Sequence, residues 1–173
     1  MVIDEDAVFA EACALGLRLQ ELGWTVVTVE SCTGGMIARA LTETAGSSVW
    51  FDRGFVTYSN AAKVELVGVS ELSLREHGAV SEPTAREMAQ GGLARSGARL
   101  ALSVTGIAGP GGATPGKPVG TVCFGWAWAD PQGRASTRVE TCRFDGDRTA
   151  VRRAAALHAL QRARSILPLS PKD

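Results

Sequence analysis

Apolar side chains recur every three or four positions in several segments of the chain, and this spacing predicts amphipathic helices. The first segment covers residues 5–22 and ends before Gly23, a residue typical of helix C-termini. Its apolar face comprises Val8, Ala12, Leu15, Leu19 and Leu22. We predict further helices over residues 36–43, 60–68, 70–78, 81–96 and 146–167. Ser59 and Ser81 are the expected N-caps of the second and fourth of these, and Gly68 is the expected stop of the second.

Short runs rich in β-branched and aromatic residues separate these helices and predict strands. The runs cover residues 24–29, 53–59, 99–106, 119–129 and 135–144. The last two are joined by the turn sequence DPQG, which predicts an antiparallel hairpin. An early β/α part followed by a late hairpin predicts an α/β fold with a mixed sheet and helices on both faces.

Composition and charge narrow the class of protein. The chain has 173 residues, 45% apolar and 21% charged, and we interpret it as one globular domain over residues 1–173 with a tail at 168–173. Lys plus Arg and Asp plus Glu both number 18, which argues against a nucleic-acid partner or an anionic membrane. The acidic N-terminal sequence lacks the basic region of a signal peptide, and no apolar run reaches the ~18 residues of a membrane span. We therefore expect a cytoplasmic protein.

Cysteine and histidine content limits the available chemistry. The cysteines contain no CxxC pair and are too widely spaced for a zinc cluster, so we expect free thiols and no metal site. They are Cys13, Cys32, Cys123 and Cys142. Only two histidines are present, His77 and His158, which leaves few candidates for a histidine-based mechanism.

The sequence ESCTGG, where a strand gives way to a helix, is the first candidate binding segment. Exposed N–H groups at a helix start bind anions such as phosphate, and neighbouring hydroxyls add donors. The alternative, simple capping of the helix by a hydroxyl side chain, is equally compatible with the spacing. On the binding hypothesis, the contacts come from Glu30, Ser31, Thr33, Gly34 and Gly35.

A loop rich in glycine and proline follows the predicted strand 99–106 and is the second candidate. Its glycines let the backbone approach a ligand closely, and long loops in compact domains are commonly functional. We expect contacts from Thr105, Gly106 and Gly109, although a plain surface loop is the alternative. Arg148, with two neighbouring arginines, is a candidate phosphate ligand or part of a solvated helix face.

Residues 47–63 carry a third candidate constellation. Without a nearby histidine, a serine nucleophile needs another base, and a lysine neutralised by burial can serve. Ser48, Tyr58 and Lys63 offer such groups, whereas the alternative makes Tyr58 a core residue and Lys63 a solvated one. Cys32 is a rival nucleophile at a helix start, although a packing role suits it at least as well.

Five segments together resemble the CinA C-terminal domain family. They are ESCTGG (30–35), GSSVWFDRGFVTYSNAAK (46–63), GAVSEP (78–83), TGIAGPGG…KPVGTV (105–122) and FDGDR…VRR (144–153). The resemblance implies a three-layer α/β/α sandwich and catalysis by Ser48, Tyr58 and Lys63, without metal or other cofactor. It also implies hydrolysis of nicotinamide mononucleotide to nicotinate mononucleotide and ammonia, in pyridine nucleotide recycling.

Two further expectations concern partners. A nucleotide-binding module without catalysis, acting through protein contacts, remains the alternative to an amidase. Trp126 and Trp128 alternate onto one face of their predicted strand. If that aromatic face is exposed, we expect a homodimer, whereas core burial explains the same residues.

Overall fold

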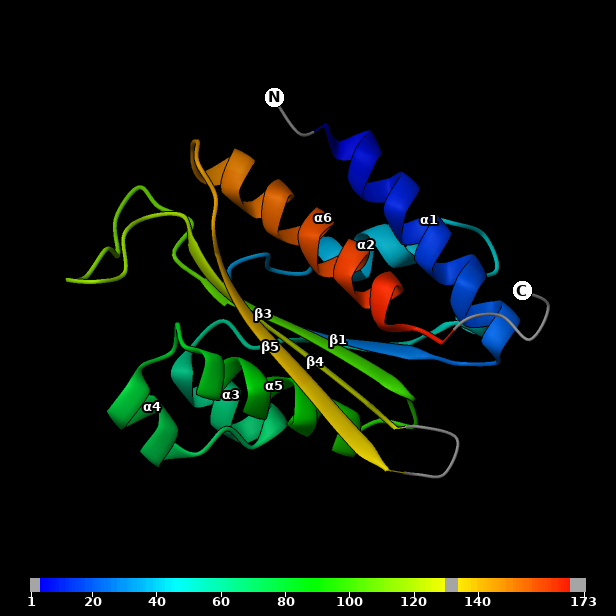
Figure 1. Cartoon of the computed structure of the whole chain (residues 1–173), viewed down its shortest axis with the longest axis horizontal. Helices are drawn as coiled ribbons and strands as arrows, with labels where there is room; N and C mark the ends of the chain where they lie inside the picture. The colour runs from blue at the N-terminus through cyan, green and yellow to red at the C-terminus, as the bar shows by residue number, and fades with distance from the viewer. Residues whose placement is uncertain (1–3, 130–133, 169–173) are drawn as a thin grey trace.

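A computed structural model describes residues 4–129 and 134–168. The chain folds into three layers, with a five-stranded sheet between two layers of helices (Figure 1). Helices α1 (Glu5–Leu22), α2 (Met36–Thr42) and α6 (Arg148–Ile166) cover one face. The other face carries α3 (Asn60–Val67), α4 (Glu71–His77) and α5 (Glu82–Ala94).

The sheet is mixed, as predicted from the order of the elements. Its spatial order is β2-β1-β3-β4-β5, in which β1 pairs in parallel with both β2 and β3. The remaining pairs, β3 with β4 and β4 with β5, are antiparallel. The strands are β1 (Val26–Glu30), β2 (Phe51–Val56), β3 (Leu100–Gly106), β4 (Thr121–Ala129) and β5 (Ala135–Arg143). This arrangement confirms the expected α/β/α sandwich, while the predicted DPQG turn lies outside the described residues.

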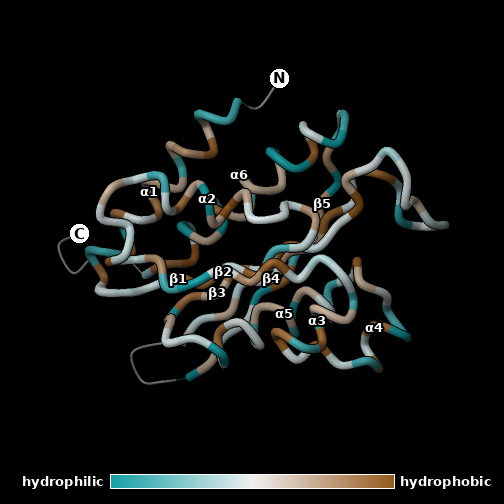
Figure 2. The backbone as a smooth tube through the Cα atoms, turned by 180° about the vertical axis from the view of Figure 1, so that it is seen from behind, coloured by the Kyte–Doolittle hydropathy of each residue, from teal (hydrophilic) through white to brown (hydrophobic). Residues whose placement is uncertain are grey.

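The core occupies both faces of the sheet because side chains alternate along each strand. On β3, Leu100 and Leu102 point toward α1 and α6, whereas Ala101 joins a smaller cluster beneath α5. The hydrophobic stretches, brown in Figure 2, accordingly gather in the sheet between the helix layers. The sheet is thus fixed from both sides, and its strand ends provide a rigid base for the loops.

The helix caps and the tryptophans bear on two expectations. Ser59 accepts a hydrogen bond from the Ala62 N–H at the start of α3, and Gly68 ends that helix in a left-handed conformation, as predicted. Trp126 is fully buried, and its Nε1–H donates to the Ala159 carbonyl oxygen at 3.1 Å. Trp128 packs against the same core, so this aromatic face gives no support to a homodimer.

A short 3-10 helix, Ser47–Val49, precedes β2. Of the helices that the structure describes, none is both long and apolar enough to cross a membrane.

Candidate active site

A cavity of about 220 Å³ opens where β1 and β3 end. Ligands of open α/β sheets commonly bind beyond the carboxyl ends of parallel strands, because the loops that follow the strands converge there. Five segments of the chain form the wall of this cavity. The lining residues are Ser31, Cys32, Tyr58, Asn60, Lys63, Ala79, Val80, Thr105, Gly106, Ala108 and Arg148. The cavity therefore joins all three candidate segments of the sequence.

A buried lysine and a buried serine meet at the bottom of this wall. Lys63, in the first turn of α3, is only 1% exposed. Its Nζ donates to Ser31 Oγ at 3.0 Å and to the Thr57 carbonyl oxygen at 2.8 Å. Ser31 directly follows β1, and its N–H donates to the Val104 carbonyl oxygen, which fixes the turn against β3. The sheet and α3 thus hold a Ser–Lys pair at hydrogen-bond distance.

Burial changes the acid–base properties of the pair. Desolvation lowers the pKa of Lys63 from 10.5 to about 8, with a smaller opposing effect from Cys32. A neutral amine is therefore accessible near physiological pH, and a neutral amine can accept the proton of a serine hydroxyl. The burial that holds Lys63 in place is also what makes it usable as a base.

For Cys32, burial makes the reactive form less accessible instead of more accessible. Burial raises the pKa of its thiol to about 12, and the carboxylate of Glu30 acts in the same direction. A thiol of this kind contributes almost no thiolate at neutral pH, and the thiolate is the nucleophilic form. The environment of Cys32 argues for a packing role rather than a nucleophilic one.

Tyr58 and Arg148 form the rim of the cavity. Tyr58 is 60% exposed, and its hydroxyl oxygen accepts a hydrogen bond from Arg148 at 2.9 Å. The same guanidinium donates to the Gly109 carbonyl oxygen at 3.0 Å. Arg148 thus connects the end of β2 with the glycine-rich loop, and it is the one arginine among the described residues lining this cavity. Tyr58 is not the core residue that the alternative interpretation expected.

Arg152, one turn further along α6, supports the wall from behind. Its guanidinium donates to the carbonyl oxygens of Cys32 and Thr33 at 3.0 and 2.8 Å. The third arginine of the group, Arg153, faces Glu5 at 3.8 Å. Only Arg148 of the three therefore reaches the cavity.

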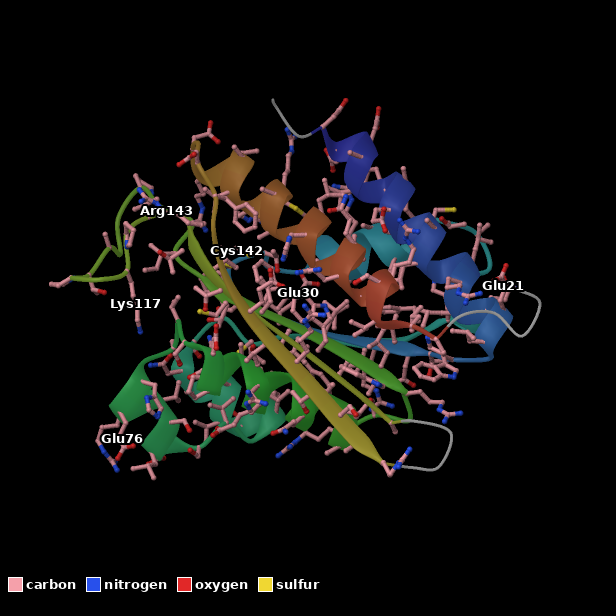
Figure 3. The ribbon with its side chains drawn as sticks, in the orientation of Figure 1. Glu21, Glu30, Glu76, Lys117, Cys142 and Arg143 are labelled. Atoms are coloured by element: carbon pink, nitrogen blue, oxygen red, sulfur yellow. The ribbon has the colours of Figure 1, made fainter. Side chains whose placement is uncertain are left out.

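Glu30 occupies the N–H groups at the start of α2, where the sequence predicted an anion site. The Glu30 carboxylate is fully buried and accepts three backbone N–H bonds, from Gly35, Ile37 and Ala38 at 2.8–3.1 Å. The donors that a phosphate would need are already used by the protein's own carboxylate. Glu30, central in Figure 3, thereby fixes the turn against the start of α2.

Three other residues of that turn also lie away from the cavity. Thr33 is fully buried, and its Oγ1 has no hydrogen-bond partner among the described residues. Gly34 and Gly35 line a separate hollow between α1, α2 and α6. Of the five contacts predicted in ESCTGG, only Ser31 lines the cavity.

Ser48 is likewise separated from its expected partners. It lies in the 3-10 helix before β2, at the end of the sheet where β1 and β2 begin. Tyr58 and Lys63 follow the other end of β2, and six strand residues span roughly 20 Å. The expected Ser48–Lys63 pair is therefore not formed in this structure, and Ser31 takes the place beside Lys63.

Several wall residues were not predicted from the sequence. Asn60, Ala79 and Val80 were not singled out, although Ala79 and Val80 belong to the GAVSEP motif. The Thr105 hydroxyl donates to the Ala79 carbonyl oxygen at 2.8 Å and so fixes this motif against β3. The one indication in the sequence that GAVSEP contributes to the site was that it is among the segments that resemble the family.

The fold and the buried Ser–Lys pair define an α/β protein with a hydrolase-like site. The family model described as the CinA C-terminal domain matches residues 9–167, and the chain belongs to this family.

Similar proteins include nicotinamide-nucleotide amidohydrolase PncC of Enterobacter agglomerans, 58% identical over 86% of this chain and 88% of the relative. The protein of the same name from Escherichia coli K12 is 54% identical, over 85% and 87% of the two chains. Among solved structures, competence/damage inducible protein CihA from Agrobacterium tumefaciens superposes with a TM-score of 0.84 at 44% identity, covering 92% of this chain and 94% of the other.

Proposed function

We propose that this protein hydrolyses the carboxamide of nicotinamide mononucleotide, giving nicotinate mononucleotide and ammonia, with Ser31 as nucleophile and Lys63 as base. The observation that carries the residue assignment is the 3.0 Å contact between the buried Lys63 amine and Ser31 Oγ within the cavity. The names of the relatives, at more than half identity over most of both chains, support the reaction.

The reaction follows the usual course of acyl transfer from an amide. Neutral Lys63 takes the proton of Ser31 as Oγ attacks the carboxamide carbon, and the tetrahedral intermediate forms. The Lys63 ammonium then gives this proton to the leaving nitrogen, and ammonia departs from an acyl-serine ester. Lys63 next deprotonates a water that attacks the ester, and it returns this proton to Ser31 Oγ as the ester bond breaks. The nicotinic acid group that is released gives its own proton to solvent and leaves as the carboxylate.

The cavity size suggests how the substrate lies. At about 220 Å³ the cavity is smaller than the ~300–1,000 Å³ typical of ligand pockets, so it suits the nicotinamide end rather than the whole nucleotide. We place the 5′-phosphate at the rim, on the guanidinium of Arg148. Tyr58 shares a hydrogen bond with that guanidinium and would orient it. The backbone N–H groups of the wall residues Gly106 and Ala108 would hold the oxyanion.

The cellular setting is part of the same proposal. We infer a cytoplasmic enzyme of pyridine nucleotide recycling that needs no metal or cofactor for the reaction and no nucleic-acid partner. A homodimer also remains a prediction. A binding module without catalysis is the alternative function, and no contact in the cavity favours it over an amidase.

Ammonia release from nicotinamide mononucleotide tests the proposal. We expect the wild-type protein to release ammonia and Ser31→Ala to lose about 10³-fold or more in kcat. Ser48→Ala is the matched control, which we expect to stay within about threefold of wild type. Full activity in Ser31→Ala, or a selective loss of activity in folded Ser48→Ala, would show that Ser31 is not the nucleophile. Binding of the nucleotide without ammonia release would establish the module instead.

A further inference from the structure

Three metal-ligating side chains converge on the α6 side of the edge strand β5, away from the Ser31–Lys63 cavity. Glu140 and Cys142 are two positions apart on β5, so they point to the same face of the sheet. His158 comes from α6, which lies over this face (Figure 1). Cys142, labelled in Figure 3, lies beside α6, so elements distant in sequence bring a thiol, an imidazole and a carboxylate together.

The distances between the three donor atoms are those of a tetrahedral coordination site. Cys142 Sγ lies 3.5 Å from His158 Nε2 and 3.6 Å from Glu140 Oε1, and the latter two atoms are 3.6 Å apart. Zinc bonds of about 2.3 Å to sulfur and 2.0–2.2 Å to nitrogen or oxygen place ligand atoms about 3.3–3.6 Å apart at tetrahedral angles. The donors therefore need almost no movement to share one ion.

Neighbouring side chains hold two of these donors in position. The His158 ring packs against Phe124, with centroids 4.8 Å apart, and against Phe144 at 5.9 Å. Arg162 donates to Glu140 Oε2 at 3.0 Å and, at a longer 3.3 Å, to Oε1. Oε1 is thus the oxygen on the Cys142 and His158 side, and a partner that orients a ligating carboxylate is typical of metal sites.

We propose that Glu140, Cys142 and His158 bind a zinc ion, with a water molecule as the fourth ligand. Thiolate and imidazole favour zinc over magnesium or calcium, which require mostly oxygen ligands. The Cys142 thiol gives its proton to solvent as sulfur binds the ion. The side chains of His158 and Glu140 are 22% and 25% exposed, so an ion and a water can enter from solvent.

This ion would have a structural rather than a chemical role. It would tie the edge strand β5 to α6, the helix that supplies Arg148 to the cavity wall and carries Arg152, which donates to the Cys32 carbonyl oxygen. The Cys142 spacing in the sequence argued against a zinc cluster, because that argument considered only cysteine pairs. The site also requires nothing of the amidase reaction, so the two proposals succeed or fail independently.

Calorimetric titration of the chelator-treated full-length chain with zinc chloride tests the site. We expect one ion per chain and, at zinc concentrations about a hundredfold above Kd, a Tm increase of about 5 °C or more. Cys142→Ser and His158→Gln should each weaken binding by about 100-fold or more. Cys13→Ser and His77→Gln are matched controls in α1 and α4 and should bind as wild type.

Cys142→Ser changes one atom, so it keeps the test valid if His158→Gln disturbs the aromatic packing. Equal zinc affinity in wild type and Cys142→Ser would overturn the proposal. So would the absence of stoichiometric binding to wild type, since the three side chains would then form only a hydrogen-bonded network with Arg162.

Discussion

The pH dependence of amide hydrolysis gives a direct test of Lys63 as the base. Its amine must be neutral to accept the Ser31 proton, and burial lowers its pKa to about 8. The active fraction of the free enzyme therefore increases with pH and levels off above this value. With a pKa of 8, about 3% of the amine is neutral at pH 6.5 and about 90% at pH 9, which corresponds to a roughly 30-fold increase in kcat/KM.

The assay measures ammonia release from nicotinamide mononucleotide at concentrations below KM between pH 6.5 and 9.5, because kcat/KM reports the free enzyme. The substrate phosphate titrates near pH 6, below this range. Lys63→Met should remove the activity at every pH in the range while leaving nucleotide binding measurable. A flat profile in the wild-type protein would refute Lys63 as a base that must lose its proton, and so would residual Lys63→Met activity with an unchanged pH dependence.

The same pKa also predicts the sign of a stability change. Between pH 8 and 10.5 the unfolded chain holds the Lys63 proton more tightly than the folded chain does, so this group's contribution to the free energy of unfolding increases with pH. Below pH 8 both states are protonated, and the contribution becomes constant. Denaturant unfolding of wild type and Lys63→Met across this window measures the difference.

Three further predictions concern the turn, the helix layer and the rim. Glu30→Gln should lower the free energy of unfolding by about 2–4 kcal/mol, because the carboxylate accepts three backbone hydrogen bonds and an amide nitrogen would face one of those donors. Urea unfolding measures the change, and a loss below about 0.5 kcal/mol would contradict the reasoning. Gly91→Ala should lower the free energy of unfolding by about 1–3 kcal/mol or more, because the added Cβ would lie 1.7 Å from the Val67 carbonyl oxygen. Gly97→Ala is the control, since its added Cβ would have no atom within 4 Å, and equal Tm values for the two variants would refute the clash. Arg148→Met should raise KM by about tenfold to a hundredfold, with a smaller effect on kcat. Arg153 faces Glu5, so Arg153→Met is the control and should leave KM unchanged. An effect on kcat alone would argue against a phosphate contact by Arg148.

Local sequence determined the elements of this fold because local forces specify them. The apolar periodicities placed the helices and strands to within a few residues, and the Ser59 cap and Gly68 stop bound α3 as predicted. These features depend on side chains within about one helical turn or along one strand. The composition also showed that histidines are scarce, which made lysine the base to consider. The motifs indicated the family.

Tertiary structure decided which of these residues meet. Ser48 is closer to Lys63 in sequence than Ser31 is, yet an entire strand separates them, whereas parallel pairing of β1 and β2 brings Ser31 beside Lys63. The Glu30 carboxylate, which the sequence offered as a ligand contact, is buried and accepts a hydrogen bond from the backbone of α2. The lowered pKa of Lys63 likewise arises from burial, in this case of its own amine. Sequence fixes which groups a chain carries, but strand register and burial determine their distances and charges, because both depend on residues remote along the chain.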